Sequence, residues 1–328
     1  MLSALLVRYS CLSLVISLTI GSYALLKADP AHAWPDKAVR LQTPFGAGGG
    51  SDAIARIVAD RLSRRWHQPV VVENKPGADG IIAVSEFLQA RDPHFLLLGF
   101  TSLITVNPIM HQKMPYVTAD LAPVSPVVDA IITVVTNPAT NLNSLTDLIE
   151  AAKRKPGALN FATVPGGGHF GFVDLQRRNG MSMTLVPYRN PIASVADLIE
   201  NRLQVAVMPL SIVLAQVKAG KLKLLCVAHD RRSPAVPDVP TTREAGAPYF
   251  RALGGLGVFA SPDMPLELRE KIARDVAAVV GDREVSERIT ELGEIPRSAS
   301  PQEFAAQLIE QAKWYSELAA ANGIKPQP

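Results

Sequence analysis

Residues 39–66 read VRLQTPFGAGGGSDAIARIVADRLSRRW, and this stretch decides the fold class. Residues 39–45 are mostly apolar and predict a β-strand, and a glycine-rich loop follows directly. From residue 52 to residue 66 the apolar side chains recur close to one face of a helix. Strand, glycine loop and helix together form the opening unit of an α/β sheet.

Outward from this unit, short apolar strands alternate with helical patterns along most of the chain. Ser144, with Asp147 three residues later, predicts a capped helix start. Strands separated by helices favour mainly parallel sheets, because parallel neighbours need a crossover connection. The last third changes character and predicts amphipathic helices with no strand between them. The expected strands are 70–72, 95–99, 159–164, 183–188, 203–209 and 222–229, and the expected late helices are 265–280, 284–292 and 300–322.

Two such series followed by a helical tail predict two lobes with a ligand cleft between them. We expect lobe 1 to be discontinuous, residues 34–131 and 252–328, and lobe 2 to comprise residues 132–251. The tail would pack back onto lobe 1. Two chain crossings between lobes form a hinge, an arrangement that allows closure around a ligand.

Residues 1–33 have the features of a cleavable signal peptide. Arg8 supplies the positive flank, and the uninterrupted apolar core at 12–20 is shorter than the ~20 residues that span a bilayer. Ala31 and Ala33 place small residues at the two positions that a signal peptidase reads. We therefore expect cleavage after Ala33 and a periplasmic mature protein.

The composition of the mature chain excludes several classes of function. Residues 1–33 carry Arg8, Lys27 and Asp29, so 31 basic and 29 acidic side chains remain, a formal net charge of +2. Such a balance gives no support to nucleic-acid binding, which needs a basic surplus. Cys226 is then the single cysteine, and its apolar surroundings predict a buried, inert thiol. The four histidines at 67, 94, 111 and 229 lack metal-ligand spacing.

The glycine loop at 46–50 is the first candidate ligand site. Glycines let backbone N–H groups approach a ligand closely, and Ser51 or Asp52 could cap the helix behind them. Because a helix N-terminus carries partial positive charge, the unit favours an anion. A tight strand-to-helix turn without ligand contact remains an alternative. Neither dinucleotide-binding nor P-loop spacing fits the loop well, because no Gly-Lys-Ser/Thr closes it.

Three further segments fit a cleft built at the carboxyl ends of strands. Residues 160–169 read NFATVPGGGH, again a strand followed by glycines and an expected helix start. Thr101 and Ser102 follow the strand that ends at Gly99. The segment 186–190, VPYRN, supplies Tyr188 and Arg189. His169 could donate one hydrogen bond to a carboxylate while neutral at pH 7, although a capping or exposed histidine is the alternative.

At these residues the chain resembles the solute receptors of tripartite tricarboxylate transporters, the Bug receptors. The resemblance runs nearly end to end in the mature chain. Its motifs, in order, are WP at 34–35, PFGAGGGSD at 44–52, QPVVVENKPGA at 68–78, NP at 107–108, MPY at 114–116, VPY at 186–188, KAGKL at 218–222, PDVPT at 237–241, EAG at 244–246 and GIKP at 323–326.

The resemblance implies a two-lobed type II periplasmic binding fold, a small carboxylate ligand and delivery to a separate membrane permease. It implies no catalysis and no cofactor or metal, and we expect a monomer. A sensory subunit that presents the same anion to a membrane signalling protein is the alternative. The expected ligand-binding residues are Phe45, Gly46, Ala47, Gly48, Gly49, Gly50, Ser51, Asp52, Thr101, Ser102, Thr163, Gly167, Gly168, His169, Tyr188 and Met208.

Two departures from the family pattern bear on the ligand. The second-lobe loop is short where relatives carry a Ser/Thr-rich stretch before the histidine. Many relatives also place an Asp after the strand matching 203–207, where it can pair with an ammonium group, and here that place is Met208. A methionine cannot neutralise a cation, so we expect a dicarboxylate or an aromatic carboxylate rather than an amino acid.

Overall fold

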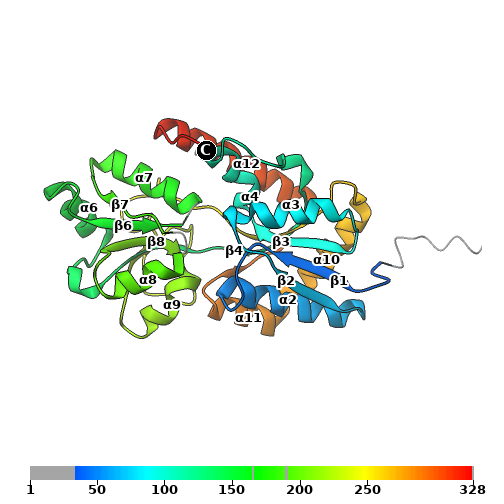
Figure 1. Ribbon diagram of the computed structural model, residues 1–328. Coiled ribbons are helices and arrows are strands. Elements are labelled where there is room, and N and C mark those ends of the chain that lie inside the picture. Colours follow the sequence, from blue (N-terminus) through cyan, green and yellow to red (C-terminus); the bar gives the residue numbers. More distant parts are fainter. Residues whose placement is uncertain (1–33, 165, 189–190, 327–328) are drawn as a thin grey trace, which may run out of the picture. The chain divides into compact units, whose positions relative to one another are not determined.

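The computed structural model describes residues 34–326 except 165, 189 and 190. The expected signal peptide and Arg189 therefore lie outside the described residues. Ala38–Pro328 forms one compact unit, and every strand among the described residues lies in it. Two β-sheets organise this unit, each covered by helices, as the sequence pattern predicts (Figure 1).

The first sheet has six strands in the order β11-β4-β10-β3-β1-β2. β1 pairs in parallel with both β2 and β3, whereas β10 runs antiparallel to β3 and β4, and β11 antiparallel to β4. The strands are β1 (Val39–Thr43), β2 (Val70–Asn74), β3 (Phe95–Phe100), β4 (Ala122–Asp129), β10 (Gly255–Ala260) and β11 (Ile295–Pro296). We call this sheet with its helices lobe 1.

The second sheet has five strands in the order β7-β6-β8-β5-β9, and with its helices it forms lobe 2. Here β5 is the reversed strand, antiparallel to β8 and β9, while β6 pairs in parallel with β7 and β8. The strands are β5 (Ile132–Thr136), β6 (Asn160–Thr163), β7 (Thr184–Leu185), β8 (Val205–Pro209) and β9 (Lys223–Val227).

The chain passes from one sheet to the other twice. β4 ends at Asp129 and β5 begins at Ile132, so the first crossing is two residues long. The second crossing leaves β9 at Val227 and enters β10 at Gly255. β5 and β10 are the strands that receive these crossings, and both run against their neighbours. The lobe boundaries at 131/132 and 251/252 remain a prediction.

Helices cover both faces of the second sheet. The apolar side chains of β8 alternate between two cores: Val205 and Val207 pack with α6 and α7, while Ala206 and Met208 pack with α8 and α9. A sheet covered on both faces needs such continuously apolar strands. These helices are α6 (Leu145–Arg154), α7 (Gly167–Asn179), α8 (Pro191–Ile199) and α9 (Leu210–Lys218). The Ser144 hydroxyl accepts the Asp147 N–H at the start of α6, which confirms the predicted cap.

Lobe 1 takes its helices from both ends of the chain. α3 and α12 pack with β3 and β10 in one core, where the rings of Phe259 and Phe304 lie 5.5 Å apart. The lobe 1 helices are α2 (Gly50–Trp66), α3 (Ile81–Ala90), the short α4 (Ser102–Thr105) and α5 (Asn107–Met110), α10 (Leu266–Val280), α11 (Arg283–Glu291) and α12 (Pro301–Ala321). The prediction of no strand among the late helices is wrong, because β11 pairs with β4 between α11 and α12. Two residues carry no periodicity that could reveal a strand.

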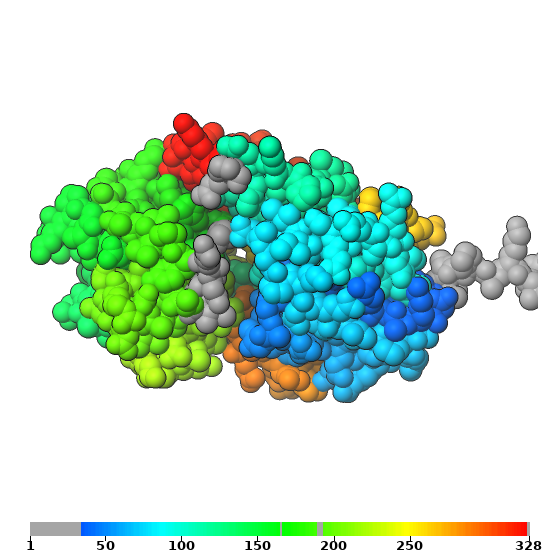
Figure 2. Space-filling model, in the orientation of Figure 1, coloured from blue at the N-terminus to red at the C-terminus, as the bar shows by residue number. Residues whose placement is uncertain are grey.

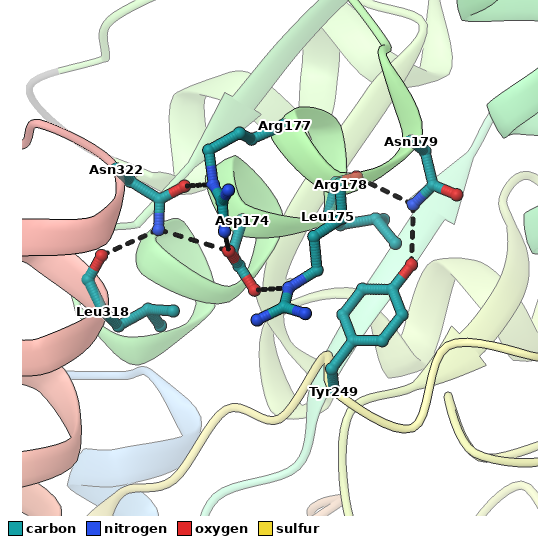
Figure 3. A network of polar contacts seen from close by, with 8 residues as sticks. All are labelled: Asp174, Leu175, Arg177, Arg178, Asn179, Tyr249, Leu318 and Asn322. Atoms are coloured by element: carbon teal, nitrogen blue, oxygen red, sulfur yellow. Dashed lines mark hydrogen bonds and ion pairs between the residues drawn. The ribbon is translucent and has the colours of Figure 1, made fainter.

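Helix α12 reaches further than the expected packing on lobe 1. Its end contacts α7 of lobe 2, where Tyr315 packs edge-on against Phe170 at 5.7 Å between ring centroids. Beyond the helix, the side-chain oxygen of Asn322 accepts a hydrogen bond from Arg177 Nε at 2.9 Å. Asn322 also lies beside Asp174, whose carboxylate forms ion pairs with both Arg177 and Arg178 (Figure 3). The tail therefore connects the two lobes.

Candidate functional site

The glycine loop of lobe 1 leaves β1 and exposes its backbone. Residues 46–48 are exposed, and Cβ atoms built on Gly48 or Gly49 would meet no atom within 4 Å. Gly49 is the N-cap of α2 and receives no side-chain cap, so the expected capping by Ser51 or Asp52 is wrong. The first N–H groups of this 17-residue helix thus lack a side-chain acceptor and can bind an anion.

Asp52 supports the loop from inside. Its carboxylate accepts the Gly48 N–H at 2.9 Å, Arg56 Nε at 3.0 Å and Asn74 Nδ2 at 2.8 Å. Burial favours the neutral acid, yet these three hydrogen bonds hold the pKa of Asp52 below its usual value. Asn74 also donates to the Phe45 carbonyl at 3.1 Å. The carboxylate is therefore engaged in the structure of the loop, and its expected contact with a ligand stays a prediction.

Two aromatic rings border the loop. Phe45 and Phe100 stand at the ends of β1 and β3, with ring centroids 5.3 Å apart in an edge-on arrangement. Phe100 remains 37% exposed although it is a large apolar side chain. The pair offers apolar surface next to the open backbone of the loop. Phe100 was not among the expected site residues, and its position directly before Thr101 was the available signal.

Thr101 and Ser102 play different parts at the end of β3. Thr101 is buried, and its backbone N–H donates to the Gly255 carbonyl at 3.0 Å. The Thr101 Oγ1 accepts the Gly255 N–H at 3.2 Å. Its hydroxyl thus joins β3 to the strand that enters from lobe 2. Ser102 is half-buried, and within the described residues its hydroxyl has no hydrogen-bond partner. Ser102 is the better placed of the two to meet a ligand.

The second-lobe loop uses its glycines for close packing. A Cβ on Gly167 would overlap the Tyr315 hydroxyl, and one on Gly168 would lie 3.0 Å from Ile132 and 3.3 Å from Val207. The Tyr315 hydroxyl donates to the Leu253 carbonyl in the same place. Close packing alone therefore explains why glycine stands at positions 167 and 168. As N-cap, Gly166 gives α7 no side-chain hydrogen bond, so this helix also begins with uncapped N–H groups.

His169 sits in the first turn of α7 with its ring half-buried. Burial lowers its pKa below the usual value, so the ring is neutral at pH 7. Within the described residues the imidazole has no hydrogen-bond partner, and its ring centroid lies 6.0 Å from that of Phe170. A neutral imidazole has one donor and one acceptor. This favours the binding interpretation over the capping one.

Tyr188 and Thr163 have partners within lobe 2. The Tyr188 hydroxyl donates to Asp197 Oδ2 at 2.6 Å, and burial together with that carboxylate raises the pKa of the phenol to about 12. Its proton is therefore committed, and the hydroxyl can only accept from a ligand. Thr163 ends β6 half-buried and donates to the Val164 carbonyl at 3.1 Å.

Met208 lies in the core rather than at an open surface. Its side chain is 1% exposed and packs among the apolar residues of α8 and α9. Met208 is therefore enclosed by apolar side chains in this structure, and its expected contact with a ligand stays a prediction. Cys226, by contrast, confirms its prediction: it is fully buried, and burial raises the pKa of the thiol to about 12.

A polar contact between the lobes was not foreseen. Ser211, in the first turn of α9, donates to Glu294 Oε1 at 2.6 Å, and Glu294 directly precedes β11 of lobe 1. Glu294 is 5% exposed, and among the described residues its Oε2 has no hydrogen-bond partner. Burial, with a smaller contribution from Asp129, raises the pKa of this carboxyl to about 8, although hydrogen bonds from Ser211 and Ile131 lower it. No spacing in the sequence connects these positions.

The contacts bring the predicted segments together around the crossings. Ser211 packs against the start of α2, since a Cβ on Gly50 would lie 3.1 Å from its own Cβ. Gly254 lies close to Thr101, since a Cβ built on Gly254 would lie 3.4 Å from the Thr101 Oγ1. Figure 2 shows a hollow between the lobe 2 surface and the lobe 1 surface on the face that it presents. We take this hollow as the candidate site, with the start of α2 in lobe 1 and the start of α7 in lobe 2 as its candidate anion-binding elements.

Two other kinds of site find no support in the described part of the chain. Across residues 34–326, apart from the three gaps, no three His, Cys, Asp or Glu side chains gather closely enough to hold a metal ion. In the same residues no helix has both the length and the apolar character needed to cross a membrane.

Comparison with known structures places the fold among periplasmic binding proteins. A structure described as a periplasmic transporter aligns with a TM-score of 0.82 and 30% identity, over 89% of this chain and 99% of that one. The structure of Rpa4515 from R. palustris with adipate aligns with a TM-score of 0.83 and 28% identity, over 90% and 100%. The periplasmic binding protein BugD aligns with a TM-score of 0.78 and 25% identity, over 90% and 100%.

Sequence comparison agrees with the fold. The chain is 30% identical to a UPF0065 protein of Bordetella pertussis over 92% of its own length and 95% of that protein. It is 29% identical to BugT of the same organism, over 95% and 97%. The model of the tripartite tricarboxylate transporter family receptor matches residues 54–323. The chain therefore belongs to this family of periplasmic, non-enzymatic solute receptors.

Proposed function

We propose that this receptor captures a small carboxylate without an α-amino group and delivers it to the membrane subunits of a tripartite tricarboxylate-type transporter. In this proposal the mature protein begins after Ala33 and acts as a monomer. The observation that carries the ligand class is the pair of helices, α2 and α7, that begin at glycines without side-chain caps. Each such end favours a carboxylate.

The lining of the cleft supports a ligand with an apolar body. The exposed Phe100 ring beside Phe45 suits a methylene chain or an aromatic ring, while Ser102 and the neutral His169 suit carboxylate oxygens. A dicarboxylate has this combination of groups. The relative Rpa4515, at 28% identity, has adipate in its solved structure, which supports trying adipate first.

Substitution of Gly49 by Val tests the loop. Gly49 has an extended backbone (φ −85°, ψ 172°) in open space, so valine fits the free protein and obstructs only a ligand that approaches the backbone. We expect adipate affinity to fall at least tenfold, about 1.4 kcal/mol, with an unchanged melting temperature. Calorimetric titration measures the affinity.

Gly48 provides a second variant with its own control. Its φ of +88° makes any side chain strained, so Gly48→Ala is compared with Gly220→Ala, which has φ +68° and equally open space outside the cleft. Both should lose similar stability, and only Gly48→Ala should lose adipate binding. Full affinity in both Gly49→Val and Gly48→Ala would leave the loop as a plain turn.

Discrimination against amino acids tests the ligand class. Within the described cleft residues the one buried carboxylate of the glycine loop, Asp52, already holds Arg56 and Asn74, so no free carboxylate would meet an ammonium group. An unpaired charge in a closed cleft is costly. We expect adipate to bind at least tenfold more tightly than 2-aminoadipate in calorimetric titration. Tighter binding of 2-aminoadipate would contradict this ligand class.

A further inference from the structure

A second cavity lies at the two crossings, outside the candidate cleft. It has a volume of about 310 Å³, and its lining comes from both crossings, the end of β11 and helix α12. None of the expected ligand-binding residues lines it. The side chains that matter here are Asp129, Arg231, Arg251, Arg297, Gln307 and Gln311. A volume near 300 Å³ is at the lower end of small-molecule sites.

The charges of this cavity favour an anion. Arg297 pairs with Asp129 at 2.9 Å, and Arg251 pairs with Asp230 at 3.2 Å. Arg231 has no ion-pair partner within the described residues, although three arginines and two aspartates line the cavity. One positive charge therefore remains uncompensated. A guanidinium in this state matches a carboxylate or phosphate in geometry and charge.

Helix α12 adds polar groups that lack partners. Gln311 is 4% exposed, and among the described residues neither its Oε1 nor that of Gln307 has a hydrogen-bond partner. A buried amide oxygen without a partner destabilises the folded protein, so a stable protein rarely keeps one without a use. A hydroxyl group both donates and accepts, and it would satisfy either end of a carboxamide.

We propose that this cavity is a second binding site, for a small oxyanion that also carries a hydroxyl group. Arg231 binds the oxyanion, and Gln311 receives the hydroxyl. Hydroxycarboxylates and phosphate share this chemistry. The site is distinct from the cleft at the glycine loops, so it does not depend on the proposed function.

Residues 253–255 lie between the second site and the candidate cleft. Leu253 and Gly254 line the cavity, while Gly255 binds Thr101 and the Leu253 carbonyl accepts from Tyr315, which packs on Gly167. The cavity therefore borders the segment that contacts both candidate loops.

The test is calorimetric titration of the mature protein with citrate, with tricarballylate (citrate without its hydroxyl) and with inorganic phosphate. We expect Arg231→Gln to weaken citrate binding at least tenfold. Gln311→Leu should abolish the preference for citrate over tricarballylate, and it preserves the volume of the side chain. Arg154→Gln is the charge-matched control, since Arg154 is exposed on α6 and pairs only with Glu150 in the described residues. Binding of phosphate but not of citrate would show that the site takes phosphate rather than a hydroxycarboxylate.

The two sites separate in the Gly49→Val variant. This variant should bind citrate within twofold of the unmodified protein while adipate binding is lost. Citrate affinity that falls in Gly49→Val and stays unchanged in Arg231→Gln would overturn the second site and leave the cleft proposal intact. Absence of citrate and phosphate binding to Gly49→Val at millimolar concentrations would overturn it as well.

Discussion

Replacing Gly255 by alanine should destabilise the protein by about 4 kcal/mol or more, at the upper end of single substitutions. Gly255 opens β10 between β3 and β4. A Cβ there would overlap the Val128 carbonyl oxygen and lie 2.9 Å from its carbon and 3.1 Å from the Asp129 Cα. All three atoms belong to the backbone of β4, so no side chain can turn aside. The strands must separate, which also strains the hydrogen bonds to Thr101.

Urea denaturation followed by circular dichroism measures this loss. Gly46→Ala is the control, because Gly46 is exposed with open space at its Cβ position, and its midpoint should stay within experimental error. An unchanged midpoint for Gly255→Ala would mean that β4 and β10 are not packed in the described register. Should the variant fail to fold at all, export yield relative to Gly46→Ala gives the same ranking.

Glu294 should make the protein less stable as the pH rises from about 5 to about 8. The pKa of its carboxyl is about 8 in the folded protein, against 4.5 for an exposed glutamic acid, so the folded state holds the proton more tightly. The contribution of Glu294 to stability is fully present below the pKa that its carboxyl has in the unfolded chain. It is lost as the pH rises through the pKa of the same carboxyl in the folded protein. The loss is on the order of a few kcal/mol.

Glu294→Gln should remove this pH dependence. A glutamine stays neutral and can still accept the Ser211 hydroxyl, so at pH 8 the variant should be more stable than the unmodified protein, and at pH 5 about equal. The ion pair of Asp129 and Arg297 lies nearby and is unchanged by the substitution. Denaturation midpoints at pH 5, 6.5 and 8 measure the slope. Glu287→Gln, at an exposed pair with Arg283, is the control. Parallel profiles for Glu294→Gln and the unmodified protein would show that Glu294 titrates as a hydrated carboxyl.

Local patterns in the sequence predicted much of the fold. The capping pair at Ser144 and the helix at 265–280 lie where expected, because local side-chain chemistry determines them. The stretch from Ala122 to Thr136 forms two strands joined by the two-residue crossing at 130–131, and the expected lobe boundary at 131/132 lies beside this crossing. β11 was missed because two residues have no period.

The candidate site was predicted in outline and corrected in detail. Gly167 and Gly49 are both glycines at helix starts, yet one is required by packing against Tyr315 and the other lies open. Sequence alone cannot separate these causes, because the contacting atoms lie far away along the chain. For the same reason the pairing of Ser211 with Glu294 was out of reach.

The position of β10 inside the first sheet has a consequence for the order of folding. β10 lies between β3 and β4, so the sheet that begins at residue 39 is incomplete until residues 255–260 are available. The second sheet is built from the continuous segment 132–227 and can close first. Contacts between such distant residues slow folding. The first sheet therefore cannot be completed before most of the chain has been synthesised.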